Sequence, residues 1–287
     1  MEFIFDYMDK SQFRHLLNDM TGEIFGFSFE KWYTAGCFEG EYIPFSYLEN
    51  GRIVANASAN VMKISLKGKE KCYIQIGTVM TRAEYRNQGL ARKLIEKILE
   101  TYKDFADGFY LFGNLDAVGF YDRIGFRRLD QYRWFLNGCV NKNSEKSGFI
   151  KAGEGDKTHY RYVLKNAVIN AEFDHINRRS LQLFYTLDMD NVYYNKELDC
   201  FAVMNIQDGV LYLDSVVSTK PVMLMDVLER VDGDYIKVVL GFTPKDNKEH
   251  FRAEQFDGED DYRFFYIGEH LECISREHLY FPVMSHA

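Results

Sequence analysis

The segment Arg86-Asn87-Gln88-Gly89-Leu90-Ala91 decides the fold, because it joins a strand pattern to an amphipathic helix pattern. Residues 74–80, which precede it, are largely apolar or β-branched and predict a buried strand. From Leu90 onward the apolar residues recur in steps of three and four, which places them on one helical face. These apolar positions are Ala91, Leu94, Ile95, Ile98, Leu99 and Tyr102. The sequence therefore predicts a strand, a loop and a helix start at this point.

The composition of this loop suits an anion. A helix begins with backbone N–H groups that have no intrahelical partner, and it carries a partial positive charge there. Gly89 lacks a side chain that would keep a ligand away, and Ala91 keeps the first helical turn thin. Arg86 and Arg92 add formal positive charge nearby. Free amides, small residues and cations at a helix start together predict a phosphate-binding site.

The surrounding chain predicts an α+β arrangement. Asn50-Gly51 supplies the positive φ angles of a tight hairpin turn between two strand patterns, and a third strand returns after Lys67-Gly68-Lys69. Residues 127–140 are expected to form a single closing strand. The full set of predicted elements in this half is strands at 2–5, 42–48, 53–64, 72–80, 110–112 and 127–140, with helices starting at Ser11, Ser28, Leu90 and Asp116.

A second motif lies beyond one predicted helix and one predicted strand. Residues 114–126 read Asn-Leu-Asp-Ala-Val-Gly-Phe-Tyr-Asp-Arg-Ile-Gly-Phe. With the first motif, this segment resembles the GNAT (Gcn5-related N-acetyltransferase) superfamily, whose cofactor signature Arg/Gln-x-x-Gly-x-Gly/Ala is met by Arg86, Gly89 and Ala91. The two motifs cover residues 72–126. The resemblance implies an α+β (α/β) GNAT acyl-CoA acyltransferase fold, with a mixed central sheet flanked by helices.

The resemblance also implies how acetyl-CoA, the co-substrate, is bound. The backbone of the strand before the loop would pair with the pantetheine arm, and the loop amides would hold the pyrophosphate. Asn114 would hold the cofactor or a water nearby. The implied binding residues are Val79, Met80, Thr81, Arg86, Asn87, Gln88, Gly89, Leu90, Ala91 and Asn114.

The reaction that the resemblance implies is acetyl transfer to a primary amine by direct attack in a ternary complex. The backbone N–H of Val79 would hold the oxyanion. Tyr121 would protonate the departing thiolate, since a tyrosine with an ordinary pKa of about 10 is a proton donor at neutral pH; its alternative is a plain core position. The base is left open: residues 72–80 hold no Asp or Glu, Glu84 lies in the loop and Glu49 lies at a hairpin turn. A water relay or a carboxylate from elsewhere in the chain would serve.

The second half repeats the first weakly. Two strand patterns around Asp208-Gly209 precede a helix pattern and a buried strand, and residues 261–265 (Asp-Tyr-Arg-Phe-Phe) echo residues 131–135 (Gln-Tyr-Arg-Trp-Phe). The spacing from hairpin turn to helix is shorter here, so this half would lack the glycine-containing loop. The polar stretch 141–158 predicts a boundary. We expect a GNAT acetyl-CoA-binding catalytic domain at 1–145 and a degenerate, smaller GNAT-like domain at 155–287; two generic α+β halves are the alternative.

The composition favours a globular cytoplasmic protein. The chain has 287 residues, of which 46% are hydrophobic, and a net charge of -8 that offers no bulk attraction to nucleic acid or anionic lipid. No signal pattern opens the sequence, and no apolar run is long enough to span a membrane. No histidine or cysteine spacing suggests a metal, so no metal is expected and the thiols are expected to be reduced. The cysteines are Cys37, Cys72, Cys139, Cys200 and Cys273.

Several alternatives stay open at this stage. The acceptor is expected to be the amine of a small molecule or peptide. Transfer of an aminoacyl or longer acyl group is one alternative function, and binding of acyl-CoA as a regulatory module without turnover is another. A homodimer is an alternative to a monomer. Arg82 and Arg92 are expected to be solvated surface charges. For residues 285–287 (Ser-His-Ala) a frayed end is favoured over docking near the first domain, where they would supply a base.

Overall fold

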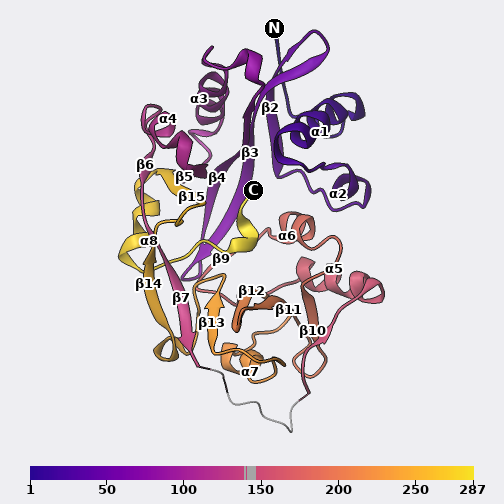
Figure 1. The fold of residues 1–287 in the computed structure, drawn as a ribbon, viewed down its shortest axis with the longest axis vertical. Helices are drawn as coiled ribbons and strands as arrows, with labels where there is room; N and C mark the ends of the chain where they lie inside the picture. The colour runs from indigo at the N-terminus through magenta and orange to yellow at the C-terminus, as the bar shows by residue number, and fades with distance from the viewer. Residues whose placement is uncertain (139, 141–146) are drawn as a thin grey trace.

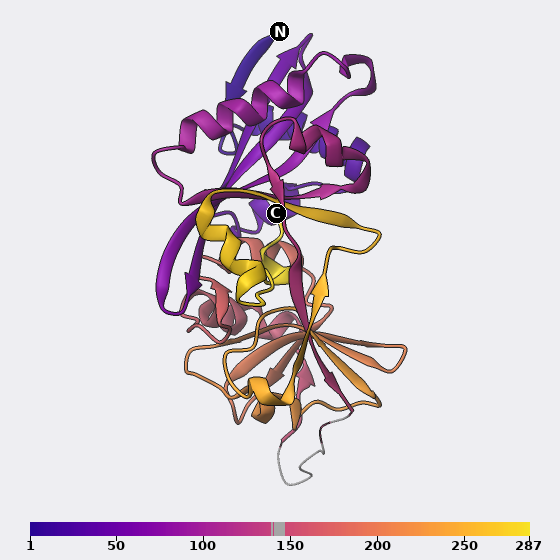
Figure 2. The same cartoon turned by 90° about the vertical axis from the view of Figure 1, so that its left-hand side faces the viewer.

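The computed structural model describes residues 1–138, 140 and 147–287, which form two sheets that follow one another along the long axis of the molecule (Figure 1). The upper sheet has helices on both of its faces, and the lower sheet is covered by shorter helices. The fold is therefore mixed α+β, as the sequence predicts. The final residues lie between the two sheets rather than at the periphery (Figures 1 and 2).

The upper sheet has the strand order β1-β2-β3-β4-β5-β15-β6, with β9 paired to β3. All its pairs are antiparallel except β4 with β5. The Asn50-Gly51 hairpin is confirmed between β2 and β3. The strands are β1 (Glu2–Phe5), β2 (Tyr42–Glu49), β3 (Arg52–Leu66), β4 (Lys69–Thr81), β5 (Gly108–Asn114), β6 (Arg127–Arg128), β9 (Phe173–His175) and β15 (Tyr262–Ile267).

Helix α3 (Leu90–Tyr102) has the bounds that its apolar spacing predicts. Its buried residues Leu94, Ile95 and Ile98 pack with β-strand residues in one core cluster. On the other face of the sheet, α1 (Ser11–Phe25) and α2 (Glu30–Thr34) cover β2 and β3 (Figure 1). A third helix, α4 (Val118–Asp122), lies on the α3 side, beside the end of β5. The sheet is thus sandwiched between two helical layers.

The lower sheet has the strand order β14-β7-β13-β12-β11-β10-β8, and within it only β12 and β13 are parallel. Its strands are β7 (Gln131–Asn137), β8 (Ile150–Lys151), β10 (Val192–Asn195), β11 (Cys200–Gln207), β12 (Val210–Ser218), β13 (Lys237–Leu240) and β14 (Arg252–Phe256). The helices of this half are α5 (Lys157–Lys165), α6 (Arg179–Tyr185), α7 (Leu224–Leu228) and α8 (Cys273–Arg276).

The two halves exchange one strand each. The expectation of a single closing strand at 127–140 is wrong, because the chain leaves the upper sheet after β6 and enters the lower sheet as β7, between β13 and β14. In return, β15 enters the upper sheet between β5 and β6. The order β4-β5-β15-β6 thus matches the order β12-β13-β7-β14. The echoing segment 131–135 lies in β7, and the segment 261–265 lies in β15 except for its first residue.

This exchange bears on the domain division. The division into residues 1–145 and 155–287 stays a prediction, and neither sheet is built from one of these ranges alone. Within the polar stretch 141–158, residues 141–146 lie outside the described part of the chain, while β8 and the start of α5 fall in the rest. None of the described helices is both long and apolar enough to cross a membrane. The four described cysteines are free thiols, and Cys139 lies outside the described residues.

Candidate functional site

The parallel strands β4 and β5 separate to form a fork. Their pairing joins residues 73–75 to residues 108–110 and extends no further among the described residues. Beyond Gln75, β4 continues to Thr81 along β3, and beyond Tyr110, β5 continues to Asn114 along β15. The unpaired edges of the two strands face a common space, because each strand keeps its outer neighbour and loses its inner one.

Inside the fork, β4 carries a bulge. The register with β3 shifts between Asn56 and Ser58, which leaves Thr78 and Val79 without a partner residue in β3 among the described pairs. Thr78 has a φ of 41°, a strained value for a β-branched residue. Buried side chains hold this conformation: Asn56 Nδ2 donates to Thr78 O at 2.9 Å, and the hydroxyls of Tyr42 and Thr78 lie 2.8 Å apart. The bulge therefore turns the backbone of Val79 out of the ladder at the fork.

The predicted phosphate loop lies at the open end of β4. Gly89 is the N-cap residue of α3, with a φ of 73°, and a Cβ there would meet nothing within 4 Å. Asn87, Gln88 and Gly89 are exposed, whereas the side chain of Leu90 is buried in the core. Leu90 can thus offer a ligand only its backbone. The loop leaves exposed backbone at a helix start, which is the arrangement that phosphate binding requires.

The three arginines of this region differ. Arg86 is exposed and lines the central cavity, with its Nε donating to Thr81 O at 3.3 Å. Arg92 is half exposed and pairs with Glu96 at 2.7 Å, as expected for a surface charge. The expectation of a surface charge at Arg82 is wrong: its side chain is 4% exposed, donates to Ile53 O at 2.8 Å and pairs with Glu23. Arg82 therefore anchors the end of β4 to β3 and α1.

A cavity of about 940 Å³ fills the fork. Seven of the predicted site residues line it, namely Val79, Met80, Thr81, Arg86, Ala91, Asn114 and Tyr121. The other four, Asn87, Gln88, Gly89 and Leu90, belong to the adjoining loop. The cavity therefore runs from the loop before α3, through the fork, to residues of α1, α2 and α6 on the far side.

Tyr121 reaches the cavity from α4. Its ring is 6% exposed and packs at 5.2 Å from the ring of Phe265 on the exchanged strand β15. Burial raises the pKa of Tyr121 to about 12, because the phenolate would lose solvation. The hydroxyl thus stays protonated through the neutral range. Tyr121 is both part of the core and part of the cavity wall, so the two interpretations of this residue are compatible.

The last residues of the sequence enter the fork, so the expectation of a frayed end is wrong. The ring of His286 stacks on Phe112 at 3.7 Å, and Gln75 Nε2 donates to Ala287 O at 3.2 Å. The hydroxyl of Tyr185 also donates to the carbonyl of His286. Burial lowers the pKa of His286 to about 3, and within the described chain its Nε2 has no hydrogen-bond partner. A neutral imidazole therefore lies at the narrow end of the fork.

Among the described residues, two acidic side chains line the cavity, and the sequence predicts neither as the base. Asp116 follows Asn114, the last residue of β5, and Glu41 directly precedes β2. The open candidates Glu49 and Glu84 are not among the described lining residues. The part of the cavity wall that comes from α1, α2 and the segment between them is strongly aromatic. The run of aromatic residues from Phe25 to Tyr33 is the sequence signal for it.

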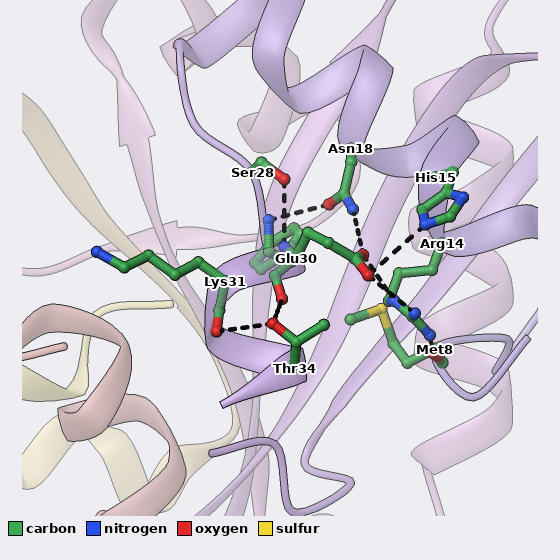
Figure 3. A network of polar contacts seen from close by, with 9 residues as sticks. Met8, Arg14, His15, Asn18, Ser28, Glu30, Lys31 and Thr34 are labelled. Atoms are coloured by element: carbon green, nitrogen blue, oxygen red, sulfur yellow. Dashed lines mark hydrogen bonds and ion pairs between the residues drawn. The ribbon is translucent and has the colours of Figure 1, made fainter. Parts of the chain in front are cut away.

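The segment that carries these aromatic residues is held by a polar network (Figure 3). Glu30 accepts hydrogen bonds from Arg14 Nε at 2.9 Å and from Asn18 Nδ2 at 2.9 Å. Asn18 Oδ1 accepts from the backbone of Phe29 at 2.9 Å, and Arg14 Nη1 donates to Met8 O at 2.7 Å. The link between α1 and α2 is therefore fixed from within.

Comparisons with known proteins agree with this geometry. Residues 33–129 match a family model described as an acetyltransferase (GNAT) domain. A GCN5-related N-acetyltransferase from Kribbella flavida is 16% identical, with 92% of this chain and 70% of that chain covered and a TM-score of 0.58. A conserved protein of unknown function from Enterococcus faecalis V583, a probable N-acyltransferase, is 14% identical, with 93% and 72% covered and a TM-score of 0.57.

A third structure, a GCN5-related N-acetyltransferase from Anabaena variabilis ATCC 29413, is 12% identical, with 92% of this chain and 72% of that chain covered and a TM-score of 0.55. At such identities the likeness shows the fold alone. A search of curated proteins gives no match. The fold likeness covers both sheets, whereas the family model covers part of the upper one.

Proposed function

Because the chain carries a domain of the GNAT acetyltransferase superfamily, we propose that it transfers an acetyl group from acetyl-CoA to a primary amine. The single observation that carries this proposal is the fork between β4 and β5, whose cavity is continuous from the loop residue Arg86 to Tyr121. A fold alone does not define a reaction. A cavity that joins the candidate phosphate loop to the candidate proton donor Tyr121 supports the acetyl-transfer reaction.

The residues present fit acetyl-CoA, which supplies an activated acetyl thioester. The exposed amides from Asn87 to Leu90 at the start of α3 would hold the pyrophosphate, with Arg86 adding charge. The unpaired edge of β4 from Val79 to Thr81 would bind the pantetheine arm, and Asn114 would contact it from β5. The backbone N–H of Val79, turned out by the bulge, would donate to the carbonyl oxygen.

The transfer balances with groups that line the cavity. The nitrogen of a neutral amine bonds to the acetyl carbon, the carbon–sulfur bond breaks, and the sulfur takes a proton from the Tyr121 hydroxyl. The amine nitrogen gives up one proton, which a water in the cavity would accept, and Tyr121 is reprotonated from solvent. Its raised pKa keeps the proton on Tyr121 until the thiolate forms.

Both halves of the chain would contribute to the acceptor side. His175, Asn177, Ser180 and Phe184 line the cavity together with residues of the upper sheet. The acceptor would be an amine of a small molecule or a peptide. We keep the cytoplasm as the predicted compartment, in line with the net charge of -8.

The direct test is thiol release from acetyl-CoA in the presence of a panel of primary amines, with the acetylated product identified by mass spectrometry. We expect release that depends on the amine and equals the product formed. Acetyl-CoA binding without amine-dependent release across the panel would instead indicate a regulatory binding module. A parallel series of longer acyl-CoA thioesters tests the donor, because 940 Å³ exceeds what an acetyl group needs.

A further inference from the structure

We propose that the acceptor is a primary amine on an aromatic or similarly flat apolar skeleton, and that Glu41 holds its amino group. This inference rests on the proposed function and names its substrate class. Three features carry it: an aromatic wall, a carboxylate beside that wall with one oxygen that has no hydrogen-bond partner among the described residues, and the small number of free polar groups on the described lining.

The aromatic wall combines two distant parts of the chain. Its six rings belong to Phe25, Phe27, Phe29, Trp32, Phe184 and Tyr185. Phe184, from α6, is the central member: its ring lies 5.7 Å from that of Phe27, 5.8 Å from that of Phe29 and 5.9 Å from that of Trp32. Edge-on and tilted contacts of this kind leave ring faces and edges for a further ring to pack against.

Two members of the wall are only half covered. Phe25 is 44% exposed and Tyr185 is 45% exposed, although both line the cavity. An apolar ligand would remove part of this surface from water, which is the main source of affinity in pockets of this kind. A strongly hydrated ligand would gain nothing from it. The wall therefore favours acceptors with an apolar skeleton over strongly hydrated acceptors.

Glu41 supplies a charge beside the wall. Its Oε2 is shielded from solvent and, within the described part of the chain, has no hydrogen-bond partner. Burial raises the pKa of this carboxyl, and a hydrogen bond with Ser180 opposes the shift. Among the described lining residues, Arg86 is the one Lys or Arg, and it belongs to the loop side. A cationic amine would pair with Glu41, since shielded carboxylates are normally paired. It would pass one proton to this carboxylate, whose pKa is raised, and attack as the neutral amine.

Several of the other polar groups nearby are already used within the protein. Asn177 donates from Nδ2 to Val61 O at 2.9 Å and accepts at Oδ1 from the backbone of Lys63 at 2.8 Å. Trp32 donates from Nε1 to Ser180 O at 2.9 Å. Among the described lining residues, the buried side-chain atoms without a partner are Glu41 Oε2, His175 Nδ1 and His286 Nε2. The several hydroxyl groups of an amino sugar would compete for these few partners, which is costly. The network around Glu30 keeps the wall in place before a ligand arrives (Figure 3).

The test compares 2-phenylethylamine with ethanolamine and glucosamine as acceptors for the full chain. We expect kcat/KM for 2-phenylethylamine to exceed that for the other two by more than about tenfold. The same wild-type protein should bind 2-phenylethylamine more tightly than 2-phenylethanol, which lacks the amine but keeps the ring. Equal or better use of ethanolamine or glucosamine would overturn the inference, and so would equal binding of the alcohol.

Variants separate the two parts of the site. Glu41→Gln should raise KM for 2-phenylethylamine by about tenfold, while Glu70→Gln, an exposed carboxylate on β4 outside the described lining, should not change it. Phe25→Ala should raise KM as well, and Phe105→Ala, 58% exposed on the α3 side, is its matched control. If the protein acetylated only hydrophilic amines, this inference would be wrong and the proposed function would stand. Failure to bind acetyl-CoA would refute the proposed function itself.

Discussion

The ring of Tyr121 lies directly against the backbone of Gly113. A Cβ at residue 113 would come within 2.7 Å of Tyr121 Cε2 and 2.9 Å of its Cδ2, and within 3.1 Å of the Phe265 ring. No side chain larger than hydrogen fits there without moving the tyrosine. The lack of a side chain at Gly113 on β5 therefore determines the position of Tyr121, the candidate proton donor.

Gly113→Ala should therefore lower kcat through displacement of Tyr121. We expect a loss of about tenfold or more in kcat, since general acid catalysis contributes on that scale or above, with little change in acetyl-CoA affinity. Steady-state kinetics and calorimetric binding measure the two quantities. Gly119→Ala is the control, because a Cβ there meets only the flexible end of Arg123 at 3.4 Å. Unchanged kcat in the folded Gly113→Ala protein would show that the position of Tyr121 is immaterial.

A second glycine makes room for the final residues. A Cβ on Gly77 would lie 2.7 Å from Ala287 O and 3.0 Å from Ala287 C. Gly77→Ala should push residues 285–287 out of the fork. Hydrogen exchange would detect this as faster exchange of the buried backbone amide of Ser285, which donates to Pro282 O at 2.8 Å. Gly22→Ala is the control, with its nearest neighbour, Phe27 O, at 3.9 Å. The same exchange rate in both variants would mean that the segment is not seated as described.

Arg86 and Arg92 should contribute unequally to co-substrate binding. Arg86 lines the cavity and, within the described part of the chain, forms no ion pair with a carboxylate, whereas Arg92 pairs with Glu96. Arg86→Ala should weaken acetyl-CoA binding by about tenfold, the usual value of one charge-assisted hydrogen bond. Arg92→Ala should have a smaller effect. Calorimetric titration at two salt concentrations measures both, and equal losses would contradict the geometry.

The buried imidazole of His286 predicts a pH dependence of stability. Its pKa falls from the ordinary 6.5 to about 3 on burial, so between these values the unfolded chain binds a proton that the folded chain does not. The contribution of neutral His286 to the free energy of unfolding is therefore complete above pH 6.5 and is lost as the pH falls toward 3. His286→Phe should make the acid loss of unfolding free energy shallower, while His175, whose pKa is also lowered to about 3, keeps part of it.

Urea unfolding at pH 7, 5.5 and 4.5 measures this slope. His270→Phe, at an exposed position, is the matched control. An identical slope in wild type and His286→Phe would place the imidazole in solvent.

The local elements of the fold follow from the sequence, whereas the partners of the strands do not. The apolar spacing after Leu90 predicts both ends of α3, and Asn50-Gly51 predicts the β2–β3 hairpin, because both signals are local. The strand exchange of β7 and β15 depends on which distant edge each strand joins. An alternating pattern predicts a strand without identifying its neighbour, so the sequence from 127 to 140 predicts one continuous strand where the structure has two, in different sheets.

The sequence likewise predicts one part of the candidate site and not the other. Residues near the two motifs, such as Arg86 and Tyr121, follow from contiguous patterns, and the structure brings them to one cavity. Glu41 and Phe184 come from segments without a motif, and both line the cavity because α6 packs against the α1–α2 connection. Burial of His286 likewise depends on the path of the whole second half. The positions of such residues depend on tertiary packing, so the spacing of residues in the sequence does not predict them.

The most direct test of the account is acetyl-CoA affinity in Gly89→Trp, measured by calorimetry beside Gly68→Trp. The two glycines have φ angles of 73° and 74°, and a Cβ on either meets nothing within 4 Å, so both variants bear the same backbone strain. The account predicts a loss of more than about tenfold in affinity for Gly89→Trp and wild-type affinity for Gly68→Trp. Wild-type affinity in folded Gly89→Trp would contradict the assignment of the pyrophosphate to the start of α3.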